Sequence, residues 1–194
     1  MTSRLHLAQQ PDADRLLSTS PLALLIGMLL DQQVTIEKAF SGPYELTRRL
    51  GHEPTAEEIA DFDTAALVEV FSQRPAIHRF PGAMAKRVQK LCRHLRDEHG
   101  GDPEAVWRDA STGTDLLARL RALPGFGEQK AKIFLALLGK QLGVRPEGWR
   151  DAAGTYGGDG ALLSVADITG PESLAAVRHH KRQAKQAAKA GSTM

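Results

Sequence analysis

The sequence of 194 residues contains a single cysteine, Cys92. One thiol cannot build an intramolecular disulfide framework, and it cannot hold an iron–sulfur cluster that needs four cysteine ligands. Cys92 stands between Leu91 and Leu95 in a pattern of helical spacing, which is more typical of a small buried side chain than of a nucleophile. Cysteine usage therefore excludes a disulfide-stabilised domain and gives no indication of thiol chemistry.

Long apolar runs are also absent. The longest, from Pro21 to Leu30, ends at Asp31 and is shorter than the ~18 residues of a membrane span. The amino-terminal segment MTSRLHLAQQPDAD lacks the hydrophobic region of a signal peptide, so we expect a cytoplasmic location. With 42% hydrophobic residues, the chain can bury a substantial core, either as one large domain or as two small lobes.

Alternating strand patterns of useful length are missing, and apolar residues recur mainly at helical spacing. The predicted fold class is therefore all-α. Ser20 is a natural N-cap for a helix that the pattern predicts from Pro21 to about Ala39. A separate short helix is predicted from Pro43 to Leu50.

The net charge is only +2, but charged side chains are segregated along the chain. Those between residues 53 and 69 are all acidic: Glu53, Glu57, Glu58, Asp61, Asp63 and Glu69. Those between residues 74 and 96 are all basic: Arg74, Arg79, Lys86, Arg87, Lys90, Arg93 and Arg96. A basic face can therefore meet a polyanion although the average charge is nearly neutral; the alternative is ordinary solvated helix faces that happen to segregate.

The segment from Leu120 to Gly143 is predicted to form a helix end, a tight turn and a second helix. Its turn is Leu123-Pro124-Gly125-Phe126-Gly127, where proline cannot continue a helix and the glycines permit a positive φ. The core-facing side of the second helix consists of Ala131, Phe134, Leu135, Leu138 and Leu142. Because the two glycines carry no side chain, backbone N–H groups can approach a phosphate closely here, and the helix dipole favours the anion.

The sequence LPGFGEQKA in this turn resembles the hairpin of helix-hairpin-helix DNA-binding proteins, and specifically that of the DNA glycosylases of the helix-hairpin-helix/Gly-Pro-Asp superfamily. The resemblance is strongest at Leu29–Thr35, which lies within LLDQQVTIEKAF, at Phe80–Leu95 and at Leu123–Gly143, and it is weak elsewhere. It implies hydrolytic excision of a damaged or mispaired base from duplex DNA in base-excision repair. It also implies a form without the iron–sulfur cluster that some members carry.

The resemblance implies a set of DNA contacts. Gln33 is carried over as the residue close to the lesion and Gln32 comes second, while capping or bridging of neighbouring helices would also explain these amides. Asp31 departs from the small or neutral residue usual before them, so it must face away from phosphate or contact a basic partner. His78 is either a hydrogen-bonding loop residue or a DNA contact. The predicted DNA-binding residues are Gln33, Gln32, Gly125, Phe126, Gly127, Gln129, Lys130, Lys86 and Arg87.

Hydrolysis of an N-glycosidic bond develops positive charge on the sugar, so a nearby carboxylate can stabilise the cation and orient the attacking water. In the resembled superfamily this acid lies beyond the hairpin, after a Gly/Pro loop. Asp151, 21 residues after Lys130, is the predicted catalytic residue; Asp167 is the second candidate and Asp159 a further rival. Asp151 could instead pair with a nearby arginine and Asp167 could cap a helix, and the segment AAGTYGGDG does not resemble the helix that normally follows the acid.

Members of the superfamily that also cleave the DNA strand use a lysine two residues after the second hairpin glycine, whose amine forms a Schiff base with the sugar. Gln129 occupies that position here and cannot be a nucleophile. Lys130 is one residue out of register, which rotates it by about 100° on a helix. We therefore expect a monofunctional glycosylase in which Lys130 contacts a phosphate.

A single unit is expected over residues 1–189, with lobes at about 21–115 and about 116–180, the second packed with the amino-terminal segment. A basic tail is expected over residues 178–194. No metal or cofactor is expected, and the partner is double-stranded DNA bound by a monomer, away from membranes. Two alternatives stay open: a noncatalytic helix-hairpin-helix DNA-binding protein, which a glycosylase assay would distinguish, and a helical protein-interaction domain, whose binding would not decline with salt.

Overall fold

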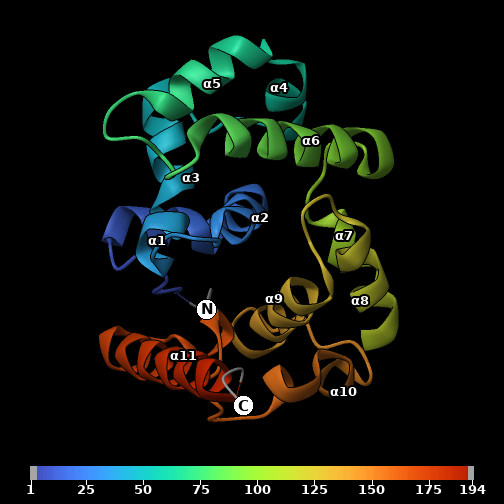
Figure 1. The fold of residues 1–194 in the computed structure, drawn as a ribbon. Coiled ribbons are helices and arrows are strands. Elements are labelled where there is room, and N and C mark those ends of the chain that lie inside the picture. The colour runs from blue at the N-terminus through green and yellow to red at the C-terminus, as the bar shows by residue number, and fades with distance from the viewer. Residues whose placement is uncertain (1–3, 192–194) are drawn as a thin grey trace.

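The computed structural model describes residues 4–191. Across these residues the fold is all-helical, with eleven α-helices, two short 3-10 helices and no β-strand, which confirms the predicted fold class (Figure 1). The elements are α1 (Pro11–Thr19), α2 (Pro21–Leu30), α3 (Ile36–Leu50), α4 (Ala56–Asp61), α5 (Thr64–Ser72), α6 (Pro81–His99), α7 (Ala105–Arg108), α8 (Gly113–Ala122), α9 (Glu128–Gln141), α10 (Trp149–Ala153), η1 (Gly154–Gly157), η2 (Val165–Asp167) and α11 (Pro171–Gly191). Within this range no single helix is long and apolar enough to cross a membrane; α1 and α2 meet that test only together, as a pair bent by 116°.

Helix α2 is the central element of the first group of helices, α1 to α6. Its residues from Leu22 to Leu30 are all buried, as their apolar character predicts. The Ser20 side chain caps α2 as expected, because it accepts a hydrogen bond from the Ala23 N–H at 3.2 Å. Helices α1 and α3 pack on α2, while α4 and α5 pack on the long helix α6 (Figure 1). The carboxyl end of α2 leads into a polar loop.

The single helix predicted over residues 21–39 is wrong, because the structure divides it into α2 and α3 at residues 31–35. Asp31 has φ −72° and ψ 70°, and Gln33 has φ +57°, so neither residue continues a helix. Thr35 then caps α3 with its side chain. The apolar pattern continues across the break and therefore conceals it, but the break creates a loop, residues 31–35, that carries both glutamines.

The separate helix predicted to begin at Pro43 is also wrong, because Pro43 lies inside α3. A proline within a helix removes one intrahelical hydrogen bond and destabilises the helix. The residue before this proline, Gly42, packs closely on α2, because a Cβ atom added to it would lie 2.6 Å from Leu30 Cδ1. Helix α3 is thus held against α2 at its proline, and tertiary packing overrides the local preference.

The second group of helices, α7 to α11, is built around α8 and α9, which the turn at residues 123–127 joins. Helix α10 packs on both, and the side chain of Trp149 at its start is buried. Two glycines leave room for this tryptophan. A Cβ atom at Gly113 would lie 2.5 Å from Trp149 Cα, and one at Gly139 would lie 2.4 Å from the indole ring. The glycines of α8 and α9 therefore determine how closely the segment after the hairpin returns to it.

Helix α11 contains most of the predicted basic tail, of which residues 192–194 lie outside the described residues. Val177 is buried near the start of the helix, whereas residues 181–190 are exposed. Arg178 forms an ion pair with Glu37 of α3. The basic helix is therefore anchored to the first group of helices by its amino-terminal half, and its carboxy-terminal half faces solvent.

Candidate functional site

The hairpin between α8 and α9 has the compact turn that the sequence predicts. Leu123 and Phe126 point into the core, and the Leu123 carbonyl accepts a hydrogen bond from the Phe126 N–H at 3.0 Å. Gly125 has φ +86°, and a Cβ atom there would lie 2.3 Å from Leu29 Cδ1, so glycine is required both by backbone conformation and by contact with α2. A Cβ atom at the exposed Gly127 would meet no atom within 4 Å.

The first turn of α9 presents unpaired backbone donors. No side chain caps it, and its first hydrogen bond runs from the Ala131 N–H to the Gly127 carbonyl at 2.9 Å. Glu128, which would repel an anion here, is paired with Arg121 at 2.8 Å and with Lys132 at 2.9 Å. The N–H groups that find no acceptor within residues 4–191 are those of Gly127, Glu128, Gln129 and Lys130. Together with the helix dipole, these donors form a site suited to a phosphate.

The loop at residues 31–35 separates the roles of the two adjacent glutamines. The Gln32 amide donates to the Leu29 carbonyl at 2.8 Å, and its Oε1 accepts from Arg87 at 2.7 Å. Gln33 is exposed and has a positive φ, and its side chain has no hydrogen-bond partner in the described part of the chain. A left-handed backbone costs a non-glycine residue about 1 kcal/mol. Gln32 therefore links α2 to α6, whereas Gln33 is presented to solvent.

His78 is a hydrogen-bonding loop residue, which confirms the more ordinary of its two interpretations. The side chain is buried; its Nε2–H donates to the Gln32 carbonyl at 2.9 Å, and its Nδ1 accepts from the Phe80 N–H at 3.0 Å. Burial lowers its pKa, which favours the neutral imidazole that these two bonds require. Phe80 is 41% exposed beneath the guanidinium of Arg79, 5.3 Å from the ring centroid. Nothing in the sequence distinguishes this exposed ring from a buried one.

Part of the basic stretch at residues 74–96 is used inside the fold. Arg93 donates to the Ala60 carbonyl at 3.1 Å, and Arg96 pairs with Asp61 at 2.5 Å, so both neutralise the carboxyl end of the acidic helix α4. Lys86, by contrast, is exposed and has no acidic partner among the described residues. The basic surface available to a polyanion is therefore smaller than the sequence suggests.

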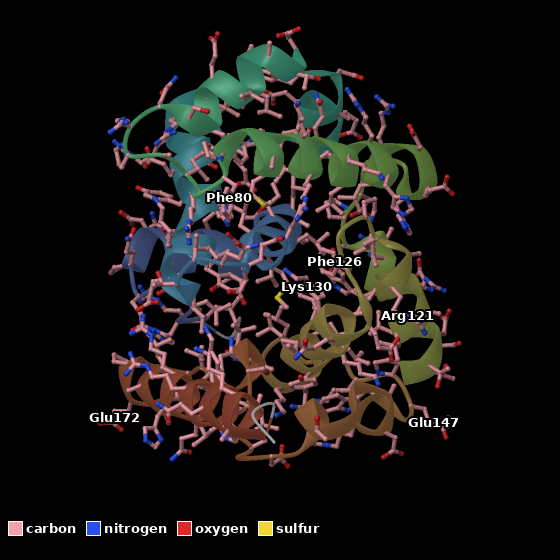
Figure 2. All side chains as sticks on the ribbon, in the orientation of Figure 1. Phe80, Arg121, Phe126, Lys130, Glu147 and Glu172 are labelled. Atoms are coloured by element: carbon pink, nitrogen blue, oxygen red, sulfur yellow. The ribbon has the colours of Figure 1, made fainter. Side chains whose placement is uncertain are left out.

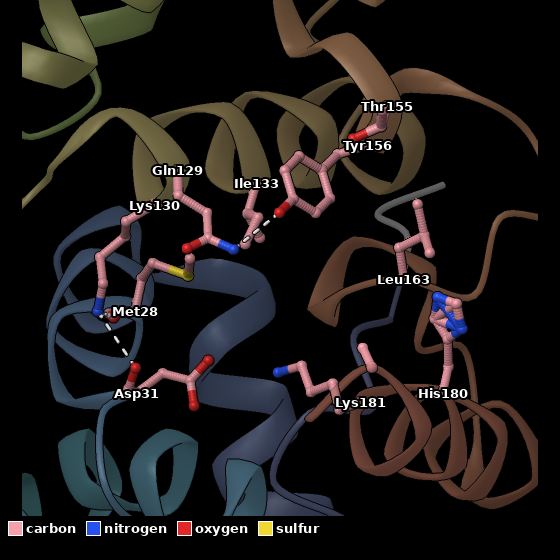
Figure 3. A pocket seen from close by; sticks show the side chains of 11 residues that line it. Met28, Asp31, Gln129, Lys130, Ile133, Thr155, Tyr156, Leu163, His180 and Lys181 are labelled. Carbon is pink, nitrogen blue, oxygen red and sulfur yellow. Dashed lines mark hydrogen bonds between the residues drawn. The ribbon is translucent and has the colours of Figure 1, made fainter. Parts of the chain in front are cut away.

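A pocket of about 540 Å³ opens where the end of α2 meets the start of α9 (Figure 3). η1, the loop residue Leu163 and α11 complete its walls, so parts of the chain that follow the hairpin helix face α2 across it. The residues that line it are Met28, Asp31, Gln129, Lys130, Ile133, Thr155, Tyr156, Leu163, His180, Lys181 and Ala184. The pocket has an acid and two lysines among mostly uncharged side chains, a composition typical of binding sites.

Lys130 connects the two sides of this pocket. Its Nζ donates to the carbonyls of Met28 at 2.6 Å, Asp31 at 3.3 Å and Leu29 at 3.4 Å, so a lysine of α9 caps the carboxyl end of α2. Figure 2 shows it near the middle of the molecule, close to Phe126. Burial lowers the pKa of Lys130 to about 8. The neighbouring Gln129 donates to the Tyr156 hydroxyl at 2.9 Å and so joins α9 to η1.

The acids predicted from sequence lie outside this pocket lining. Asp151 is exposed on α10, and Asp159 pairs with Arg150 at 2.9 Å. The Asp167 carboxylate pairs with Lys140 at 2.6 Å and accepts from the backbone N–H groups at the start of η2. Asp31, which in the sequence is only a departure from the residue usual before the two glutamines, is the acid that lines the pocket.

The comparison with known families agrees with this arrangement. Residues 26–190 match the HhH-GPD superfamily of base excision DNA repair proteins, and the chain belongs to this family. The matched region includes α2 from Ile26 onward, the loop at residues 31–35, the hairpin and most of α11. No curated protein matches the chain. The family is mostly DNA glycosylases and implies DNA binding.

Replacing Lys130 should show how strongly the two groups of helices depend on its contacts. We expect Lys130→Met to lower the free energy of unfolding by about 2 kcal/mol, because the α2 carbonyls lose a charged donor. Urea-induced unfolding monitored by circular dichroism measures the change. Lys132→Met, which removes only a surface pair, is the matched control and should cost less than about 0.5 kcal/mol. Equal losses in the two variants would contradict the assigned role.

Proposed function

We propose that this protein is a monofunctional DNA glycosylase that hydrolyses the N-glycosidic bond of a damaged or mispaired base in duplex DNA. The observation that carries the proposal is the position of the pocket. It lies directly beside the phosphate-binding turn of α9, and its volume of about 540 Å³ is within the range of small-molecule sites. A base that leaves the stack next to the hairpin can therefore enter it.

Contacts within the fold support a continuous DNA-binding surface. Gly125 packs on Leu29, so the hairpin adjoins the end of α2. The bond between Arg87 and Gln32 holds α6 against the loop at residues 31–35. Free backbone donors, an exposed glutamine amide and exposed basic side chains thus follow one another along the molecule. Such groups bind phosphates and lesion edges without requiring a particular sequence.

The proposal includes the absence of strand cleavage by a lysine. Gln129 stands at the position of the lysine nucleophile in the family members that cleave the strand, and its amide is bonded to Tyr156. Lys130 is next to it, but three backbone carbonyls accept hydrogen bonds from its Nζ. An amine held in this way is oriented toward α2 and away from the pocket centre, where a sugar would stand (Figure 3).

A second candidate function is a noncatalytic DNA-binding protein. One observation favours it: Asp151 and Asp167, the acids predicted from the sequence, do not line the pocket. Both functions require DNA binding, and only the enzyme requires base release. Asp151 as the catalytic residue, with Asp167 second, stays a prediction of the sequence.

DNA affinity should depend on Gly127. Its added Cβ would disturb no atom of the protein, yet it would stand among the N–H groups that face the phosphate. We expect Gly127→Ala to leave the unfolding midpoint unchanged and to weaken duplex binding roughly tenfold, the loss of about one charged hydrogen bond. Fluorescence anisotropy at fixed salt measures it. Gly170→Ala, just before α11, is the control, because an added Cβ there also meets no atom within 4 Å. Equal affinities of Gly127→Ala and this control would contradict the phosphate site.

Base release decides between the two functions. Duplexes that each carry one deaminated, oxidised, alkylated or mispaired base should be incubated with the full chain, and the abasic product revealed by alkaline cleavage. We expect release from at least one duplex, whereas a noncatalytic binder would retain affinity and release nothing. Asp151→Asn and Asp167→Asn belong in the same assay. Unchanged release in Asp151→Asn would remove that residue as the catalytic acid.

Trapping with borohydride tests the monofunctional assignment. The full chain is mixed with abasic duplex at pH 8.5, above the pKa of about 8 for Lys130, so that most of its amines are unprotonated. We expect no covalent protein–DNA adduct beyond that formed by Lys130→Met, which controls for reaction of surface lysines. An adduct that requires Lys130 would overturn the assignment.

A further inference from the structure

Asp31 brings a carboxylate into the pocket from the end of α2 (Figure 3). Its backbone is held from both sides. The N–H donates to the Gly27 carbonyl at 3.1 Å and to the Met28 carbonyl at 3.3 Å, and the Asp31 carbonyl accepts from Lys130 at 3.3 Å. With ψ at 70°, the chain leaves the helix at this residue, and the side chain extends into the cavity rather than along α2.

The carboxylate of Asp31 is available to a ligand. Its oxygens accept no hydrogen bond from any residue in the range 4–191, although the residue is partly buried. Burial raises its pKa, while the ammonium groups of Lys130 and Lys181 act in the opposite direction. Figure 3 shows Lys181 pointing toward Asp31 from α11. Because Lys181 is exposed, its ammonium can turn to a phosphate when DNA enters, and Asp31 then faces the ligand.

We propose that Asp31 is the catalytic carboxylate of this protein, an assignment that rests on the glycosylase function proposed above. It is the acid that lines the pocket, and it stands beside the turn that would hold the phosphate of the flipped nucleotide. The other candidates are exposed, as Asp151 is, or neutralised by their neighbours, as Asp167 is by Lys140. Asp31 thus takes the part that the sequence assigns to a residue after the hairpin.

The reaction follows from this placement. As the bond between C1′ and the base nitrogen breaks, its electron pair leaves with the base, and the positive charge that develops on the sugar is stabilised by the Asp31 carboxylate. A water molecule then forms a bond to C1′ and transfers a proton to Asp31, which passes it to the departing base. The products are the neutral base and an abasic sugar. Lys130 is a positioning residue, because it holds the Asp31 backbone without touching the reacting atoms.

Two measurements on Asp31→Asn test this assignment. In single-turnover reactions on a duplex from which the wild type releases the base, we expect the rate constant for base release to fall on the order of 10²-fold. In binding, a duplex with a cationic pyrrolidine in place of the sugar is compared with one that carries a neutral tetrahydrofuran. The wild type should prefer the cation, and the preference should fall about tenfold in Asp31→Asn. Asp31→Glu should retain much of it, and the distant, exposed Asp12→Asn should change neither quantity.

The two readouts separate this proposal from the one on which it rests. If the wild type releases no base from any duplex, the glycosylase function fails, yet the preference for the cationic duplex still tests Asp31. If base release occurs and Asp31→Asn changes neither the rate nor the preference, Asp31 is not the carboxylate. Thermal unfolding of Asp31→Asn should match the wild type within a few degrees, because the native carboxylate makes no hydrogen bond within the fold.

Discussion

The contact between the Lys130 ammonium and the carbonyl end of α2 is the interaction on which the candidate site depends. The last carbonyls of a helix have no partner within the helix and carry its negative dipole. In α2 these groups lie inside the protein, because the helix is buried nearly all round. A lysine from the first turn of the hairpin helix donates to two of them, Met28 and Leu29, and to the carbonyl of Asp31 directly after the helix. One side chain therefore ends α2, orients α9 and closes one wall of the pocket.

The same contact links the proposed phosphate site to the pocket. The turn that presents free N–H groups begins α9, and Lys130 lies in that turn. Leu29, whose carbonyl accepts from Lys130, also packs on Gly125 of the hairpin, while the amide of Gln32 bonds to the same carbonyl. A shift of the hairpin relative to α2 would thus move the phosphate site, the glutamine loop and Asp31 together. The phosphate site, the glutamine loop and Asp31 are therefore fixed relative to one another by the contacts between the hairpin and α2.

Local signals made much of this predictable from the sequence. The hairpin is predictable because proline and glycine mark a turn directly, and the cap at Ser20 is predictable because a hydroxyl side chain directly before an apolar helical run is a preferred N-cap. The break between α2 and α3 is not visible in the sequence, because the apolar pattern continues across it and the lysine that bonds the end of α2 lies about a hundred residues away. The two glutamines could not be separated by sequence either, because only Arg87 and His78 show which one is bonded.

The position of Asp31 is electrostatically unfavourable for the fold alone. An acid at the carboxyl end of a helix opposes the helix dipole, and burial further disfavours its charged form. A neutral residue would end α2 equally well, since the side chain makes no hydrogen bond. Lys130 of α9 and Lys181 of α11 partly offset the free-energy cost of keeping the Asp31 carboxylate charged. Ionisable groups with perturbed pKa values cluster in functional pockets, which makes such a group a candidate for a chemical role. The arrangement of charge around Asp31 is therefore better explained by a developing cation than by stability.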